Sequence, residues 1–313
     1  MEFHFDKAFR IFLRTYPFVL VRLVVSVIVL AGSVMWWVGI YYLFAHWPFP
    51  GPSFLAWIFG GILFGSGVKL VRNYVLYLIK AAHVSVITCF AVQGELPLNT
   101  DQLSFGLQTV LKHFLRVSIL FGVDQLVRVV LKAFNRSVFR LLGFIPGAGP
   151  LRGFSQRVLD YSVGYVDEAI LSYTLLQAET NPWAAAREGL VLYVQNWKTI
   201  LGSGFVLALI SYGLTTVLAA PGLILFWAVP TLTGKIAAGV FAGVAVVLKF
   251  AVMDPFSLTS VIVNFHAAIA GQTADPTWGR RLEDVSKEFK KFNSEAEKWG
   301  LGRTTPPPAP SQA

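Results

Sequence analysis

Two long stretches of this chain contain no carboxylate, and this feature restricts its fold more than any other. Asp and Glu are absent from residues 7–94 and from residues 189–253. Lys and Arg are absent from residues 23–68 and 199–234, inside the same stretches. Because a charged side chain is costly in hydrocarbon, such gaps mark segments that lie in a lipid bilayer. Helices satisfy their own backbone hydrogen bonds there, so the gaps predict an all-α integral membrane protein.

The composition agrees with a chain that is solvated by lipid. Hydrophobic residues make up 55% of the 313 residues and charged residues 14%, against about 25% charged residues in soluble domains. The formal charge is +9, and this excess is expected at the cytoplasmic face beside anionic lipids. No nucleic-acid partner is predicted, because the basic residues lack aromatic interleaving and zinc spacing. Cys89 is the only cysteine, which excludes an internal disulfide and a cysteine-built metal site.

The gaps predict about four transmembrane helices in two hairpins, because each span approaches or exceeds the ~20 residues needed to cross a bilayer. The first hairpin is residues 17–80, with spans at 18–44 and 54–70. Three prolines within residues 46–52 separate these spans, because proline cannot continue a helix.

The second hairpin is predicted at residues 199–271. Its spans are residues 199–220 and 236–252, and Pro221-Gly222 is expected to end the first of them. Gly239 and Gly243 repeat a spacing of small residues that lets helices approach closely. Both turns lack Lys and Arg, whereas basic residues flank both hairpins. The positive-inside rule therefore predicts a multi-pass protein of the cell membrane with both termini in the cytoplasm.

The amphipathic segments outside the hairpins are expected at the cytoplasmic membrane face. Residues 1–16 predict an interfacial helix, and residues 81–198 predict a basic amphipathic helical region. Within it, residues 107–142 carry apolar side chains at three- and four-residue steps and cations at every fourth position. A helix in the membrane plane would bring these cations to anionic lipids, and a helix lining an anion pathway is the alternative. The candidate contact residues are Arg128, Lys132, Arg136 and Arg140.

Two carboxylates interrupt the apolar segment 158–176. Asp160 and Asp167 lie on one face, about two helical turns apart. In a membrane they would form a candidate proton or cation site. The weak hydrophobicity of the segment favours a solvated surface position instead. If part of residues 107–176 crosses the bilayer, five or six spans are possible.

A pattern of helix, break and new helix recurs three times, and each break begins at a glutamine: Gln93, Gln177 and Gln272. Asn181-Pro182 and Asp275-Pro276 are signatures of a helix start. The side-chain oxygen accepts from free N–H groups, and proline in the first turn loses no hydrogen bond. The pattern indicates a duplicated helical corner, although common capping motifs also coincide by chance. Such repeats occur in many transporters.

The segment 272–300 predicts one amphipathic helix with a heptad-like apolar seam. The seam residues are Trp278, Leu282, Val285, Phe289, Phe292, Ala296 and Trp299. This seam can dock on the membrane domain of the same chain or pair with a second copy in a homo-oligomer. Residues 301–313 are rich in proline and predict a disordered tail.

The sequence lacks the motifs of enzymes and metal sites. Its histidines fall in separate segments, without a His-Glu-x-x-His or His-x-x-x-His pattern. It contains no Gly-x-Ser-x-Gly and no Walker lysine. We therefore predict no enzymatic activity, no catalytic residue, no cofactor and no metal.

One part of the chain resembles known membrane families. Residues 165–196, with Asn181-Pro182-Trp183-Ala184-Ala185-Ala186-Arg187, are similar to a pattern in several uncharacterised bacterial multi-pass membrane families. Residues 265–289, which begin with Phe265-His266, resemble the same pattern. Choline transporter-like proteins have a loosely similar corner, with a small-residue break and an Asn before a span. The resemblance implies a multi-pass membrane fold and carries over no functional residue.

Two classes of function agree with these features. The first is a transporter or channel-like protein for a small solute or lipid, which the repeats, the glycine-bearing spans and the charged middle region favour. The second is a membrane scaffold, assembly factor or lipid organiser that transports nothing. It is favoured because the predicted spans hold no charge at their centres. A polar cavity lined by Asp160, Asp167 or Arg128 would distinguish transport from a scaffold.

Overall fold

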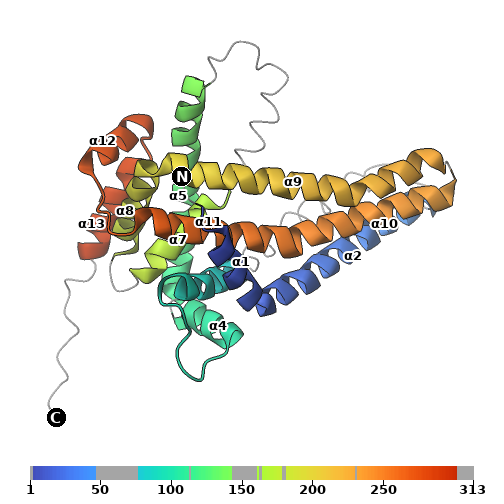
Figure 1. Cartoon of the computed structure of the whole chain (residues 1–313), viewed down its shortest axis with the longest axis horizontal. Helices are drawn as coiled ribbons and strands as arrows, with labels where there is room; N and C mark the ends of the chain where they lie inside the picture. Colours follow the sequence, from blue (N-terminus) through green and yellow to red (C-terminus); the bar gives the residue numbers. More distant parts are fainter. Residues whose placement is uncertain are drawn as a thin grey trace.

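The computed structural model describes residues 3–46, 77–112, 114–142, 161, 164–177, 181–229 and 231–301. Every regular element in these ranges is a helix. The helices form a compact body and a long arm (Figure 1). The arm consists of α2 (Tyr16–His46), α9 (Trp197–Ala228) and α10 (Leu232–Leu248). The body contains an unlabelled helix, Tyr77–Val92, together with α1 (Phe5–Arg14), α4 (Gln102–Lys112), α5 (Phe114–Leu142), α7 (Val166–Leu176), α8 (Pro182–Gln195), α11 (Asp254–Ile269), α12 (Pro276–Val285) and α13 (Phe289–Leu301).

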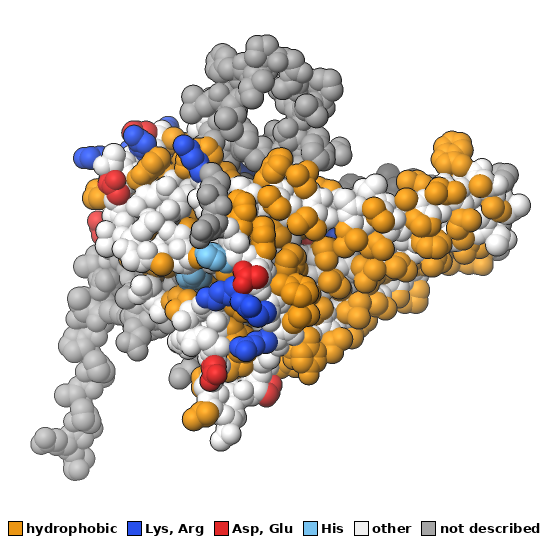
Figure 2. Space-filling view, viewed as in Figure 1, with side chains coloured by type: hydrophobic (Ala, Val, Ile, Leu, Met, Phe, Trp, Pro, Cys, Tyr) orange, Lys and Arg blue, Asp and Glu red, His pale blue; other side chains and the backbone are white. Residues whose placement is uncertain are grey.

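The arm carries apolar side chains on its outer surface, and the charged side chains in view gather on the body (Figure 2). Trp227, near the tip of the arm, keeps 80% of its surface exposed. Apolar exposure along whole helices is stable in lipid but not in water. The segments Trp197–Ala228 and Thr233–Ile269 are long and apolar enough to cross a membrane. A third candidate is the pair Phe5–Arg14 and Tyr16–Gly32, which is bent by 71°.

These findings confirm the predicted helical membrane class at the level of two or three candidate spans. The first span of the first hairpin falls within α2. Its returning span, predicted at residues 54–70, lies outside the described residues. The first hairpin and the total of four spans therefore stay predictions.

The expected helix end at Pro221-Gly222 is wrong. α9 continues through Pro221 to Ala228, and the reversal of the chain follows there. A proline is tolerated within a membrane helix because neighbouring helices and local adjustments satisfy the freed carbonyl group. Gly222 has a packing role instead, since a Cβ atom at this position would lie 2.8 Å from Cβ of Phe241 on α10. The pair Pro221-Gly222 therefore marks a close contact between α9 and α10 rather than a turn.

The returning helix runs from the arm into the body without a turn. A π-helical segment, η1 (Lys249–Met253), joins α10 to α11. Pro255 explains this irregularity, because its ring nitrogen cannot donate to the preceding turn and one extra residue relieves the clash. The bulge brings Lys249 and Asp254 to the junction of arm and body.

The middle of the chain forms the core of the body. The apolar face of α5, including Val127, Val130, Leu131 and Phe134, is buried, and α5 packs against α7 and α8. The apolar stripe therefore contacts protein. Lys132 and Arg136 remain exposed on the opposite side of α5, so their contact with anionic lipids stays a prediction.

The predicted helix starts at the corners are confirmed. Asn181 Oδ1 accepts from the backbone N–H of Trp183 at 3.0 Å, and Asp275 Oδ1 accepts from that of Thr277 at 2.7 Å. In the corner that follows Gln93, Asp101 caps α4 in the same way through the N–H of Leu103 at 2.9 Å.

The third corner contacts the C-terminal end of α8. Gln195 Oε1 accepts from the backbone N–H of Asp275 at 2.9 Å, and Asn196 and Gln272 exchange side-chain hydrogen bonds. The third corner is thus fixed to the junction of α8 and α9 in the body.

The C-terminal segment is two helices rather than the one continuous helix predicted. α12 ends at Val285 and α13 begins at Phe289, because Ser286 has an extended backbone and its hydroxyl bonds to Glu288 instead of continuing the helix. Leu282, Phe289 and Phe292 are nevertheless fully buried, and both helices pack on α8. The seam therefore docks within its own chain, while pairing with a second copy stays untested.

Candidate functional site

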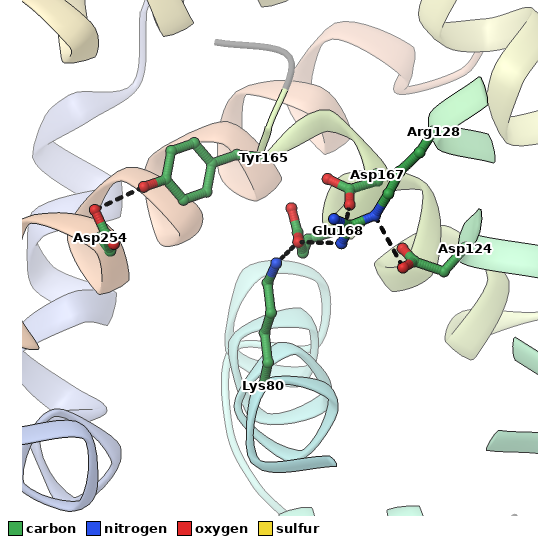
Figure 3. Close-up of polar contacts among 7 residues, drawn as sticks. All are labelled: Lys80, Asp124, Arg128, Tyr165, Asp167, Glu168 and Asp254. Carbon is green, nitrogen blue, oxygen red and sulfur yellow. Dashed lines mark hydrogen bonds and ion pairs between the residues drawn. The ribbon is translucent and has the colours of Figure 1, made fainter. Parts of the chain in front are cut away.

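A cluster of charged residues lies inside the body, where α5, α7 and helix Tyr77–Val92 meet (Figure 3). Arg128 is its centre. Its Nε lies 3.1 Å from Oδ2 of Asp124, one turn earlier on α5, and its Nη2 lies 2.5 Å from Oδ2 of Asp167 on α7. The spacing of four residues places Asp124 and Arg128 on one face of α5. Arg128 thereby connects two helices through two carboxylates.

Lys80 and Glu168 complete the cluster. Lys80 points from helix Tyr77–Val92 toward Glu168 and forms an ion pair with it (Figure 3). Glu168 Oε1 also lies 3.6 Å from Arg128 Nη2. The side chains of Asp124, Asp167 and Glu168 are only 3%, 1% and 1% exposed. Three buried carboxylates thus share two cations, which leaves one formal negative charge in excess.

Burial controls the protonation of this cluster. Removal from water raises the pKa of Asp167 above the usual value for aspartate, and the positive charge of Lys80 only partly offsets this effect. The nearby carboxylate of Asp124 raises the pKa of Asp167 further. The excess negative charge can therefore be relieved by a proton on Asp167.

A second polar group lies at the junction of arm and body. Tyr165 donates a hydrogen bond of 2.8 Å to Asp254 Oδ1, and Lys249 Nζ lies 3.2 Å from the same oxygen. The Lys249 ammonium also lies 4.7 Å from the ring centroid of Phe250. The π-helical segment η1 ends immediately before Asp254, and such bulges are frequent at functional sites. Asp254 is therefore held by partners from both sides of the junction.

Between these two groups the structure has a cavity of about 520 Å³. The polar residues of its lining are Arg22, Ser26, Lys80, Tyr165 and Asp254, and we refer to them together as the polar end. Its apolar wall is formed by Val25, Val29, Leu30, Ile79, Val246, Val247 and Phe250. The volume falls within the about 300–1,000 Å³ of small-molecule sites. The cavity can hold a molecule that has both a polar and an apolar part.

The structure brings together two of the residues predicted from sequence, Arg128 and Asp167. The expectation that Asp167 is solvated at the surface is wrong, because the body packs around the first turn of α7. Lys132 and Arg136 lie on the exposed side of α5, away from the cluster. Asp160 and the side chain of Arg140 lie outside the described residues.

The sequence did not single out the other members of the site: Arg22, Lys80, Asp124, Tyr165, Glu168, Lys249 and Asp254. The signal that could have found the charged members is their isolation. Arg22 is the only charged residue of α2, and a lone charge in an apolar membrane helix is a functional candidate. Which charges meet in space cannot be read from such a pattern.

Another polar chain in the body is structural. Ser172 Oγ lies 2.7 Å from Nε2 of His266 and 2.6 Å from Oγ1 of Thr88. Ser172 is fully buried, so a substrate cannot reach its hydroxyl. Across the part of the chain that the structure describes, no group of three His, Cys, Asp or Glu side chains is arranged to hold a metal ion.

Comparisons of the chain with protein-family models, with curated proteins and with solved structures find no match. The resemblance of residues 165–196 to bacterial multi-pass families and to choline transporter-like proteins therefore stays a prediction.

Proposed function

We propose that this chain is a transporter or channel-like membrane protein for a small amphiphilic solute or a lipid, without enzymatic activity. One observation carries the proposal: the cavity at the junction of arm and body joins a charged end to an apolar wall. A buried charge cluster lies beside it and shares Lys80 with its lining. Burying ionisable groups is expensive, and such groups gather at functional sites.

The cavity supports lipid-like molecules better than hydrated ions. Seven of the lining residues are apolar, and they come from α2, helix Tyr77–Val92, α10 and η1. An ion pathway requires polar groups along its length, but the described part of the arm beyond the cavity bears one charged residue, Lys235. The occupant is accordingly expected to enter from the bilayer rather than through a water-filled pore.

The proposed orientation places the body at the cytoplasmic face of the cell membrane. α1 and α13 both belong to the body, so both ends of the described chain lie at the base of the arm (Figure 1). Exposed cations, including Lys132 and Arg136, lie on the body, where they would face anionic lipids. The tip between α9 and α10 would then face the outside.

A specific observation favours a second function, a scaffold or lipid organiser that transports nothing. α9 and α10 pack closely at Gly222, and their hairpin carries no Asp or Glu from residue 199 to residue 248. Such a hairpin would anchor the body without moving a solute. The content of the cavity distinguishes these functions, because a scaffold does not need an occupant there.

The experiment is native mass spectrometry of the protein released from mild detergent, followed by reconstitution into vesicles. We expect a bound lipid or solute on the wild-type chain, and its loss in Val247→Trp, which fills the apolar wall. The matched control is Val240→Trp, seven residues earlier on α10 at an exposed position outside the cavity. A wild-type protein that carries no molecule and moves none across vesicles would contradict transport and favour the scaffold.

A further inference from the structure

We propose that the cavity takes a membrane lipid with an anionic headgroup, and that Arg22 binds the phosphate of that headgroup. This inference rests on the proposed function, because it assigns the chemical class of the molecule in the same cavity. The occupant is a lipid whose acyl chain lies on the apolar wall while its charged end reaches the base of α2.

Arg22 differs from the other cations of the site because it forms no close ion pair among the described residues, and the charge of Asp254 acts on it only from a longer distance. Lys80 is paired with Glu168, Arg128 with Asp124 and Asp167, and Lys249 with Asp254. No described carboxylate lies within 4.0 Å of the Arg22 guanidinium. The chain neighbours cannot supply one, since residues 7–94 contain no Asp or Glu.

Asp254 is the carboxylate that shares the cavity lining with Arg22, and one of its two oxygens already has partners elsewhere. The same oxygen, Oδ1, accepts from Tyr165 at 2.8 Å and from Lys249 at 3.2 Å. The polar end of the cavity therefore presents one guanidinium without an ion-pair partner among the described residues, next to groups that are already paired.

A guanidinium in this position is suited to an anion. A cation that is partly removed from water loses hydration, and an oxyanion restores the lost interactions. The planar fork of arginine matches phosphate and carboxylate groups and donates two parallel hydrogen bonds to them. A zwitterionic headgroup would also bring a positive charge close to Lys80, so a net negative headgroup fits better.

The apolar wall argues for a lipid rather than free phosphate. Val246 and Phe250 line the cavity and yet keep 44% and 50% of their surfaces exposed. The wall is therefore continuous with the lipid-facing surface of the arm. An acyl chain can remain in the bilayer while the headgroup occupies the polar end, whereas inorganic phosphate would leave the apolar wall uncovered.

The experiment compares lipid retention by native mass spectrometry after incubation with phosphatidylglycerol or phosphatidylcholine, in separate samples, and with inorganic phosphate. We expect the wild type to retain the anionic lipid about tenfold better than the zwitterionic one, a typical effect of one charged hydrogen-bonded contact. Arg22→Gln is expected to retain both lipids equally, and Arg22→Lys to keep part of the preference. Arg136→Gln, which neutralises an exposed cation on α5, should behave as the wild type.

The outcomes separate this inference from the proposed function. If Arg22→Gln retains lipid but keeps the full preference for phosphatidylglycerol, the assignment of Arg22 is wrong and the cavity still holds a lipid. If inorganic phosphate alone displaces the anionic lipid from the wild type, the occupant is a soluble anion and the lipid assignment is wrong. If the wild type retains neither lipid, the inference fails, whereas the proposed function fails only if the protein also carries no native molecule and moves none across vesicles. Arg22→Lys keeps the test valid should Arg22→Gln not fold.

Discussion

The guanidinium of Arg128 lies 2.5 Å from the carboxylate of Asp167, and this contact joins α5 to α7 inside the body. The two residues are far apart in the sequence, and each also interacts with another charged group of the cluster. Asp167 is almost completely buried, whereas Arg128 keeps 41% of its side chain exposed. Arg128 therefore extends from the surface to neutralise carboxylates that water does not reach.

Replacing Arg128 by Met should destabilise the body. The change keeps much of the apolar stem and removes the cation from two buried carboxylates, Asp124 and Asp167. Loss of one partner of a buried ion pair costs about 3–5 kcal/mol, and the partial exposure of Arg128 favours the lower end of this range. The measurement is denaturant unfolding in detergent. Arg136→Met is the control on the same helix, and an equal loss in both variants would contradict a special role for Arg128.

Stability should fall with rising pH because of Asp167. Burial raises the pKa of this carboxyl in the folded chain, so the folded state binds a proton more tightly than the unfolded state does. The stabilisation is fully present below the unfolded value of about 4 and is lost as the pH rises toward the raised pKa. Asp167→Asn removes the ionisable carboxyl group, so this contribution to the pH dependence should be absent from the variant.

The test of this pH dependence is thermal unfolding of both proteins in detergent from pH 4 upward. We expect the melting temperature of the wild type to decline more steeply with pH than that of Asp167→Asn. Parallel declines in the two proteins would show that other groups cause the effect.

Local signals in the sequence predicted the local structure well. Asn181-Pro182 and Asp275-Pro276 begin helices as expected, because a cap requires only a side chain and the next few backbone N–H groups. The carboxylate-free stretches likewise identified the apolar arm, since the cost of burying charge in lipid is independent of fold details. The apolar seam of the C-terminal segment was also found, although Ser286 interrupts its helix.

Tertiary contacts explain what the sequence did not predict. Pro221 is a helix breaker by local rules, yet α9 continues through it because the close packing with α10 supports the helix. Gly239 and Gly243 have the spacing of a tight helix contact, but a Cβ atom at Gly239 would meet no described atom within 4 Å. The members of the charge cluster come from three helices, and periodicity within one helix cannot reveal such a meeting point.

The side chain of Asn181 makes two contacts whose effects on stability can be measured separately. Its Oδ1 accepts from the N–H of Trp183, and its Nδ2 donates to the carbonyl of Ala296 on α13 at 2.7 Å. Asn181→Ala removes both contacts and should cost about 1 kcal/mol for the cap alone. Asn181→Ser keeps a capping oxygen but cannot reach α13.

Hydrogen exchange can distinguish these two effects. We expect faster exchange in the first turn of α8 only for Asn181→Ala, and faster exchange in α13 for both variants. If the backbone amides of α13 exchange at the wild-type rate in both variants, the hydrogen bond from Asn181 to Ala296 does not hold α13 against the body.

Cysteine labelling tests the orientation of the chain. Cys89 is the only cysteine and is buried, so a Cys89→Ala background provides a chain without reactive thiols. Single cysteines at Ala228, at the tip of the arm, and at Glu297, in α13, occupy exposed positions. A membrane-impermeant reagent added to intact cells should label only the cysteine at position 228. Labelling of position 297 alone would reverse the proposed orientation and leave the membrane assignment intact.

The close approach of α9 and α10 makes Gly222 sensitive to the smallest substitution. In Gly222→Ala, the new Cβ would lie 2.8 Å from Cβ of Phe241 and 3.0 Å from the carbonyl oxygen of Ala238, so the two helices must separate. Overpacking of this kind typically costs about 1–3 kcal/mol. Gly213→Ala is the control on the same helix, since a Cβ there meets no described atom within 4 Å. Because alanine also favours the helix over glycine, we expect Gly213→Ala to keep or raise the melting temperature in detergent, while Gly222→Ala lowers it. A melting temperature of Gly222→Ala at or above that of Gly213→Ala would mean that the two helices of the hairpin do not pack as closely as the structure has them.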